Sequence, residues 1–183
     1  ICGGCSFQHL SSENQINAKQ DWLQSAFKGQ AKVEPKEWLK PIHIGSWGYR
    51  RKARLGVRYV AKKEKVLVGF RERKSSFVTV MSRCEVLHPS LGDNLELLSE
   101  CIERLSIKEH IPQIEVAIAE KDTILILRHL QPLTNKDEEV LSDFAQKLQI
   151  TWYLQSGGLD TIKPLTKSVQ LTYSIPDHSI EMS

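Results

Sequence analysis

Residues 49–59 alternate between two kinds of side chain, and this alternation limits the fold more than any other feature of the sequence. Ala53, Leu55 and Val57 would point one way, and Arg54 and Arg58 would point the other. A period of two is the pattern of a β-strand with one face in a core and one in water. The segment therefore predicts a half-buried strand with a cationic outer face.

The rest of the chain predicts hairpins and helices. A turn at 61–64 leads into a return strand at 66–70 and a third strand at 77–80, which together form an antiparallel meander. Further strands are expected at 114–119, 123–129, 150–154 and 169–175, and helices at 11–28, 91–105 and 136–148. We expect Gly29 to end the first helix and residues 30–46 to be irregular. This order favours an α+β fold, an antiparallel β-sheet of hairpins with flanking helices.

Composition indicates a soluble globular protein. The 183 residues are 40% hydrophobic and 26% charged, which is ordinary for such a protein. No apolar run approaches the ~20 residues of a membrane span, and no signal-peptide pattern is present. We therefore expect a cytoplasmic location without a membrane partner. Because the chain starts at Ile1 on a cysteine motif and stops just after a strand-like run, we expect it to be a piece of a longer protein.

The cysteines suggest a metal site. Cys2 and Cys5 flank two glycines, and Cys84 follows far downstream. Two thiolates at this spacing can bind one metal from a tight turn, although a redox pair or a plain turn gives the same pattern. A fourth ligand would come from upstream of Ile1 or from His9 or His88, so zinc and an iron–sulfur cluster both remain open.

The fourth cysteine has a different environment. Cys101 shares a helical apolar stripe with Leu98, Ile102 and Leu105. A cysteine at this spacing behaves as a small hydrophobic residue, so we expect it in the core.

Positive charge is concentrated in residues 47–74, which hold eleven Lys or Arg and only two Glu. A row of cations along a strand matches the phosphates of a nucleic acid, although a solvated sheet face that resists edge pairing would carry similar charges. The candidate RNA-binding residues are Arg50, Arg51, Lys52, Arg54, Arg58, Arg71, Arg73 and Lys74. We expect Tyr49 and Phe70 to face the core, while the position of Trp47 stays open.

Motifs of catalysis are missing from the sequence. It has no phosphate-binding loop, no G-x-G-x-x-G, no nucleophile elbow and no H-E-x-x-H. Its six histidines are scattered. The residues alone therefore indicate a binding module without a catalytic centre.

Several segments together resemble the bacterial 23S rRNA (uracil-5-)-methyltransferases. They are the CGGC motif with QHL behind it, WGYRRKARLGVRY, GFRERKSS, RCEVLHP, ILRHLQPL and LTYSIPD. The resemblance covers nearly the whole chain and implies the central domain of such an enzyme. It implies a cluster-binding N-terminal arm with the first helix over 1–29, and an RNA-binding domain over 30–183. The N-terminal β-barrel and the C-terminal methyltransferase domain of the family would lie outside this chain.

The resemblance also implies cofactors and partners. In this family four cysteines hold a [4Fe–4S] cluster; Cys2, Cys5 and Cys84 match the last three, and the first would lie upstream. The S-adenosylmethionine site and the catalytic residues belong to the C-terminal domain, so none is expected here. The implied partner is ribosomal RNA, bound by a monomer. A tRNA uracil-5 methyltransferase and a non-catalytic zinc-containing RNA-binding module are the alternatives.

One segment departs from the family. A Phe-x-Gln-x-Asn pattern that helps to bind the target base is usual after the last strand. The matching positions here are Ser179, Glu181 and Ser183, so that role is not carried over.

Overall fold

The computed structural model describes residues 2–175 and 180–182, and it divides the chain into two compact units. One unit is Cys5–Ser46, and the other joins the N-terminal residues up to Gly4 to the chain from Trp47 onward. This division differs from the expected one between residues 1–29 and 30–183, which separates a cluster-binding arm from an RNA-binding domain. The expected division concerns function, so it stays a prediction. Ser179 and Ser183 lie outside the described residues.

The Cys5–Ser46 unit is built on helix α1, Ser12–Ala26. The Ser11 side chain caps it by accepting the Asn14 N–H at 3.3 Å, which confirms the expected start. The expectation that Gly29 ends the helix is wrong. The chain continues as a π-helical turn over Phe27–Ala31 and leaves it at Lys32, whose φ is 51°. Residues 32–46 contain no helix or strand, as predicted.

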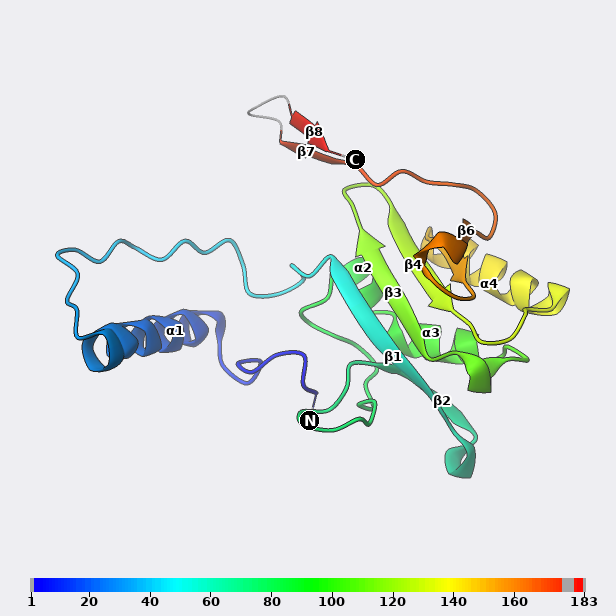
Figure 1. Cartoon of the computed structure of the whole chain (residues 1–183), viewed down its shortest axis with the longest axis horizontal. Helices are drawn as coiled ribbons and strands as arrows, with labels where there is room; N and C mark the ends of the chain where they lie inside the picture. The colour runs from blue at the N-terminus through cyan, green and yellow to red at the C-terminus, as the bar shows by residue number, and fades with distance from the viewer. Residues whose placement is uncertain (1, 176–179, 183) are drawn as a thin grey trace. The chain divides into compact units, whose positions relative to one another are not determined.

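A six-stranded sheet forms the centre of the other unit (Figure 1). Its strands are β1 Lys52–Val60, β2 Lys65–Gly69, β3 Gln113–Ile118, β4 Thr123–Arg128, β5 Thr151–Gln155 and β6 Ile162–Pro164, in the order β2-β1-β3-β4-β5-β6. All neighbours are antiparallel except β4 and β5, which are parallel because helix α4 (Asn135–Leu148) connects them. The α+β prediction is confirmed, with one parallel pair that the hairpin pattern did not indicate.

The core lies between this sheet and its helices. Helices α2 (Pro89–Gly92), α3 (Leu95–Glu103) and α4 lie on one face of the sheet, behind it in Figure 1. The predicted helical stripe and the inward residues of the strands are all buried: Leu55, Val57, Leu98, Cys101, Ile102, Leu105, Ile114 and Val116. The alternation in β1 therefore separates a buried face from an outer face that α2, α3 and α4 leave uncovered (Figure 1).

The expected third strand at 77–80 is wrong. Within the described residues this segment makes one isolated bridge, between Arg71 and Val78. The cause lies in two glycines that face each other across β1 and β2, Gly56 and Gly69. A β-carbon on Gly56 would meet the Val78 side chain at 3.1 Å, and one on Gly69 would meet Met81 Sδ at 2.7 Å. The segment therefore crosses the outer face where side chains are absent.

The expected strand at 169–175 is shorter than predicted. Strand β7, Tyr173–Ile175, pairs with β8, Ile180–Met182, in a separate two-stranded sheet. The Tyr173 hydroxyl donates to the Ile118 carbonyl at 2.8 Å, so this segment is fastened to the end of β3.

Strand β2 forms one edge of the sheet, and helix α3 supplies partners for its outward amides. The Val66 N–H donates to Glu103 Oε2 at 3.1 Å, and the Val68 N–H donates to Ser99 Oγ at 3.1 Å. Among the residues that the structure describes, no helix combines the length and apolar character that crossing a bilayer requires.

Candidate nucleic-acid interface

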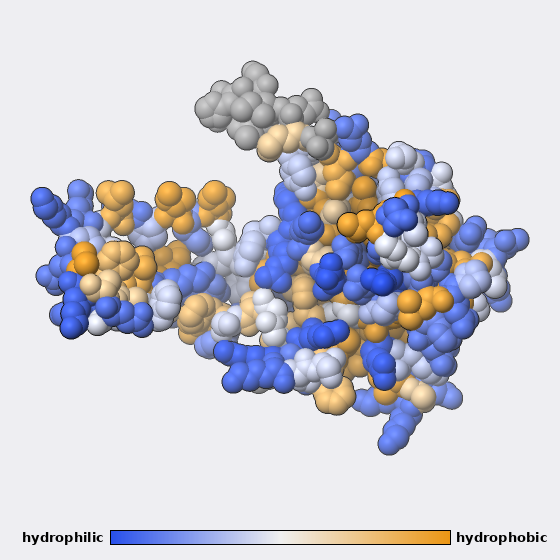
Figure 2. Space-filling view, in the orientation of Figure 1, coloured by the Kyte–Doolittle hydropathy of each residue, from blue (hydrophilic) through white to orange (hydrophobic). Residues whose placement is uncertain are grey.

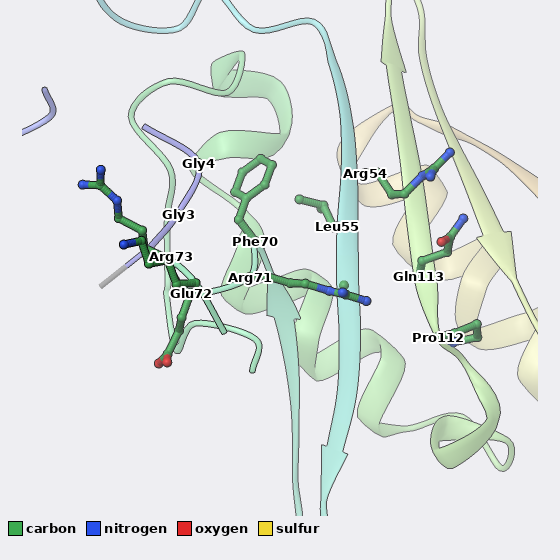
Figure 3. Close-up of a pocket in the computed structure, with 12 residues that line it drawn as sticks. Gly3, Gly4, Arg54, Leu55, Phe70, Arg71, Glu72, Arg73, Pro112 and Gln113 are labelled. Atoms are coloured by element: carbon green, nitrogen blue, oxygen red, sulfur yellow. The ribbon is translucent and has the colours of Figure 1, made fainter. Parts of the chain in front are cut away.

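An open groove of about 600 Å³ lies where β1, β3 and the loop after β2 meet (Figure 3). Its polar lining is Arg54, Arg71, Glu72, Arg73, Lys74 and Gln113. Figure 3 shows Arg71 reaching across β1, with Arg54 and Gln113 on the other side of that strand. Figure 2 shows strongly hydrophilic groups gathered on this face of the sheet, among apolar ones. The groove is thus a cationic recess on the outer face.

The N-terminal segment forms one wall of the groove. The Gly3 N–H donates to the Arg71 carbonyl at 2.8 Å, and Cys2 forms an antiparallel bridge with Glu72. The Gly4 carbonyl accepts from Arg50 Nη2 at 3.2 Å. A β-carbon on Gly3 would lie 3.0 Å from the Arg71 carbonyl oxygen, so glycine permits this close approach. The start of the cysteine motif therefore supports the loop that carries the groove's cations.

Three predicted RNA-binding arginines already contact protein groups. The Arg50 guanidinium lies 5.4 Å from the centre of the Phe70 ring, besides its bond to the N-terminal segment. Arg51 Nη1 donates to the Ala119 carbonyl at 3.0 Å. Arg54 pairs with Glu115 Oε1 through Nε at 3.0 Å and Nη2 at 2.9 Å. The guanidinium groups of these three arginines therefore already have partners within the protein.

The other five predicted cations are freer. Within the described residues none of them forms an ion pair: Lys52, Arg58, Arg71, Arg73 and Lys74. Three of these line the groove, in the loop after β2. The charge available for a ligand therefore lies more in this loop than along β1, where the alternation had indicated it.

Three aromatic residues lie near the cationic segment, and one of them, Tyr49, differs from its predicted position. Tyr49 is 59% exposed, so the expectation that it faces the core is wrong. The reason is that β1 begins only at Lys52, so Tyr49 lies before the pleated segment. Trp47 is 42% exposed, and Phe70 is half-buried against Gly4 and Arg50 at the groove.

The three candidate metal ligands belong to different parts of the structure. Cys2 lies in the sheet unit, where its Sγ accepts the Gly4 N–H at 3.3 Å, a contact that suits a thiolate ligand. Cys84 lies in the same unit and is only 7% exposed, whereas Cys5 belongs to the Cys5–Ser46 unit and contacts Gln8. Across residues 2–175 and 180–182, no three His, Cys, Asp or Glu side chains are grouped as a metal site would require. The ligand set therefore stays a prediction.

His88 has a structural task instead. Its Nδ1 accepts the Ser90 N–H at 3.3 Å and so caps α2. Burial, followed by the nearby charge of Arg51, lowers the pKa of His88 below its usual value.

Cys101 is a core residue, as expected. It is 4% exposed, and burial raises the pKa of its thiol to about 12. Such a thiol stays protonated and is a poor nucleophile or ligand at neutral pH.

Sequence reasoning missed Arg128. In the register of the sheet it is paired with Gln113, which lines the groove, and Gln113 is paired with Gly56 on its other side. The period-two pattern places Arg128 on the same face as Ile124 and Ile126, but it does not show that Gln113 lies beside Arg128.

Curated proteins that are similar to the chain include several methyltransferases of one name. The chain is 65% identical over 182 residues to the 23S rRNA (uracil(1939)-C(5))-methyltransferase RlmD of Vesicomyosocius okutanii, a match that covers 100% of this chain and 42% of the relative. The enzymes of that name from Nitrosococcus oceani and Bordetella avium are 49% and 46% identical, over 95% and 100% of this chain and 39% of each relative. The chain is homologous to one segment of these methyltransferases. This confirms the resemblance seen in its motifs, and the chain spans about two fifths of the relatives' length. No family model matches the chain.

A solved structure has a similar fold. It is the tRNA (uracil-54, C5)-methyltransferase of Pyrococcus abyssi in complex with S-adenosyl-L-homocysteine, with a TM-score of 0.53 and 18% identity. The match covers 90% of this chain and 40% of that one. At this identity the likeness supports the fold and carries nothing about the substrate.

Proposed function

We propose that this chain is the central, RNA-binding part of an S-adenosylmethionine-dependent 23S rRNA uracil-C5 methyltransferase. The observation that carries the proposal is the 65% identity to a segment of an enzyme of that name. Identity at this level over a whole segment accompanies a shared task. In this proposal the chain holds the RNA, while methyl transfer takes place on residues outside it.

The groove gives the proposal a physical basis. Arg71, Arg73 and Lys74 offer charges that no acidic side chain of the described residues neutralises by an ion pair. Neutralising phosphates with such residues releases counterions and drives RNA binding. The recess beside them is within the size range of sites for one small ligand, about 300–1,000 Å³. It therefore suits a single unpaired nucleotide better than an RNA double helix.

We also propose that Cys2, Cys5 and Cys84, with one ligand outside this chain, hold a [4Fe–4S] cluster. The bridge from Cys2 to Glu72 and the Gly3–Arg71 hydrogen bond suggest its role here. A cluster would tie the N-terminal segment in place and so stiffen the loop that carries the cations. Its contribution would be structural.

A segment exchange tests the function. The matching segment of the Vesicomyosocius okutanii enzyme is replaced by this chain, and methyl transfer from labelled S-adenosylmethionine is measured on a 23S rRNA transcript and on a tRNA transcript. We expect methylation of the 23S rRNA alone. A folded hybrid that methylates only tRNA would favour the tRNA alternative, and one that methylates neither would overturn the proposal.

Metal analysis of the same hybrid tests the cluster separately. After anaerobic purification we expect about four irons and four sulfides per chain. Cys2→Ser and Cys84→Ser should abolish the iron, whereas Cys101→Ser should retain it because Cys101 is a core residue. One zinc ion in place of iron would favour the zinc-containing module and reject the cluster.

A further inference from the structure

A register line crosses the outer face of the sheet at the groove. Gly69 pairs with Gly56, Gly56 with Gln113, and Gln113 with Arg128. Residues paired in register lie on the same face. The β2 end of the line is covered, because Met81 and Val78 lie against the outer faces of Gly69 and Gly56. The open part of the line therefore runs from the groove at Gly56 across β3 to β4, at right angles to the row of cations that the sequence suggested along β1.

Gly56 has no side chain of its own and lines the groove together with Gln113, and the Val78 side chain borders it. Side chains of β1 rise on either side of it, since Arg54 and Arg58 share the face of Gly56. Arg71 reaches over β1 from the opposite wall (Figure 3). The recess thus opens across the strand and leads toward β3.

Charge is available at both ends of the line. Arg71 supplies the charge at its start, from the loop after β2, whereas the Arg73 side chain points away from β1 (Figure 3). Arg128 stands at its far end, half-buried and without an ion pair among the described residues. Between them Arg54 is already paired with Glu115, and Gln113 Nε2 donates to the same carboxylate at 3.1 Å. The two ends can therefore take phosphates, while the middle presents polar and neutral groups.

The line is closed beyond Arg128. Its next partner in register is Gln155, which is 6% exposed and whose Nε2 donates to the Gly158 carbonyl at 3.3 Å. A ligand that follows the line would therefore end at Arg128. From Gly56 to Arg128 the line spans two strand spacings, about 10 Å.

We propose that an unpaired stretch of RNA crosses the sheet along this line, with its phosphates held by Arg71 at one end and by Arg128 at the other. The inference rests on the proposed function. It adds Arg128 as a contact residue and a direction for the RNA across the strands. A duplex is the wrong shape for a recess of this size, because its bases are stacked inside.

Binding of a labelled single-stranded RNA of about 12 nucleotides to the chain tests the direction. Four arginines are replaced singly by glutamine, each removing the same charge: Arg71→Gln and Arg128→Gln on the line, Arg58→Gln along β1, and Arg104→Gln at the residue that follows helix α3. We expect the first two to weaken binding about tenfold and to flatten the logarithmic salt dependence by about 0.7. Arg58→Gln should weaken binding less than Arg128→Gln does, because Arg58 lies along β1 and not on the line. Arg104→Gln should change the affinity by no more than about twofold.

Three results would overturn the inference in different ways. If Arg58→Gln weakens binding and Arg128→Gln does not, the RNA follows β1 and only the direction is wrong. If a duplex of the same sequence binds more tightly than the single strand, the unpaired ligand is wrong. If the unaltered chain binds neither RNA, the proposed function fails with it. Circular dichroism of each variant separates these results from loss of folding.

Discussion

Asp137 is a buried carboxylate whose hydrogen bonds join three parts of the chain. It is the third residue of α4, where it accepts the N–H and the hydroxyl of Thr134 in a capping box. It also accepts the N–H and the hydroxyl of Ser106, both at 2.6 Å, from the loop before β3. Burial alone would raise the pKa of Asp137, but these hydrogen bonds outweigh it and lower the pKa below its usual value.

Replacing Asp137 by asparagine should cost about 3 kcal/mol of the free energy of unfolding at neutral pH, because an NH2 group replaces an oxygen that accepts hydrogen bonds and the charge that strengthens the remaining ones is lost. A lowered pKa stabilises the fold above the unfolded value of about 3.9 and does so less as the pH falls through the folded value. The difference between the two proteins should therefore shrink toward about pH 3. Urea denaturation at both pH values measures it. Asp143→Asn, on the exposed side of α4, is the control and should change little; a difference independent of pH would contradict the account.

Individual side chains were predicted where the pattern of burial decides them. Leu55, Val57 and Cys101 are buried as their spacing indicated. The partners of Arg50 and Arg54 could not be predicted, because Gly4 and Glu115 are far away in sequence and meet them only in the folded sheet. Arg128 was missed for the same reason: its importance comes from a neighbour in register.

At the scale of the elements, the short helix α2 and the Cys84 loop pack backbone against backbone. The Cys84 N–H donates to the Gly92 carbonyl at 2.8 Å. A β-carbon on Gly92 would lie 2.6 Å from the Cys84 carbonyl oxygen and 2.7 Å from that of Leu87. Neither oxygen can rotate away, so glycine is required for the loop to close over α2.

Gly92→Ala should therefore destabilise the sheet unit by about 3 kcal/mol. Gly157→Ala is the matched control, because its new β-carbon would make an ordinary contact with Thr161 at 3.4 Å. Chemical denaturation followed by circular dichroism compares the two. Equal stability of both variants would show that the loop has room for the methyl group.

Elements with a long periodic pattern were predicted well, and those that depend on another segment were not. Strands β3 and β4 and helix α4 lie close to their expected bounds. The segment at 77–80 has the apolar content of a strand, but it crosses Gly56 and Gly69 instead of pairing along β2. The parallel partnership of β4 and β5 likewise depends on the crossover of α4, which single-strand patterns do not encode.

At the scale of the whole molecule, the chain consists of two compact units joined through residues with no regular structure. Residues 32–46 contain no helix or strand, and Lys32 and Lys36 are exposed within them. By contrast, the cations of β1 are part of a hydrogen-bonded strand. Proteases cut extended, exposed backbone first.

Limited trypsin digestion should therefore cut first after Lys32 and Lys36 and leave the sheet as a resistant fragment. Mass spectrometry of the early products identifies the sites. A variant with glutamine at both positions should lose these cuts and keep the rest of the digestion pattern. First cuts after Arg71, Arg73 or Lys74 would instead show that the groove loop opens more readily than this stretch.

Helix α3 also affects whether other polypeptides can pair with the β2 edge of the sheet. The outward amides of Val66 and Val68 are already bound to Glu103 and Ser99. An extended peptide joins a sheet by hydrogen-bonding to unpaired amides at its edge, and the same step begins amyloid growth. Because the helix that covers the core also occupies these donors, the β2 edge does not recruit a further strand. Crowding many copies of this chain together should therefore not turn that side of the sheet into a template for fibres.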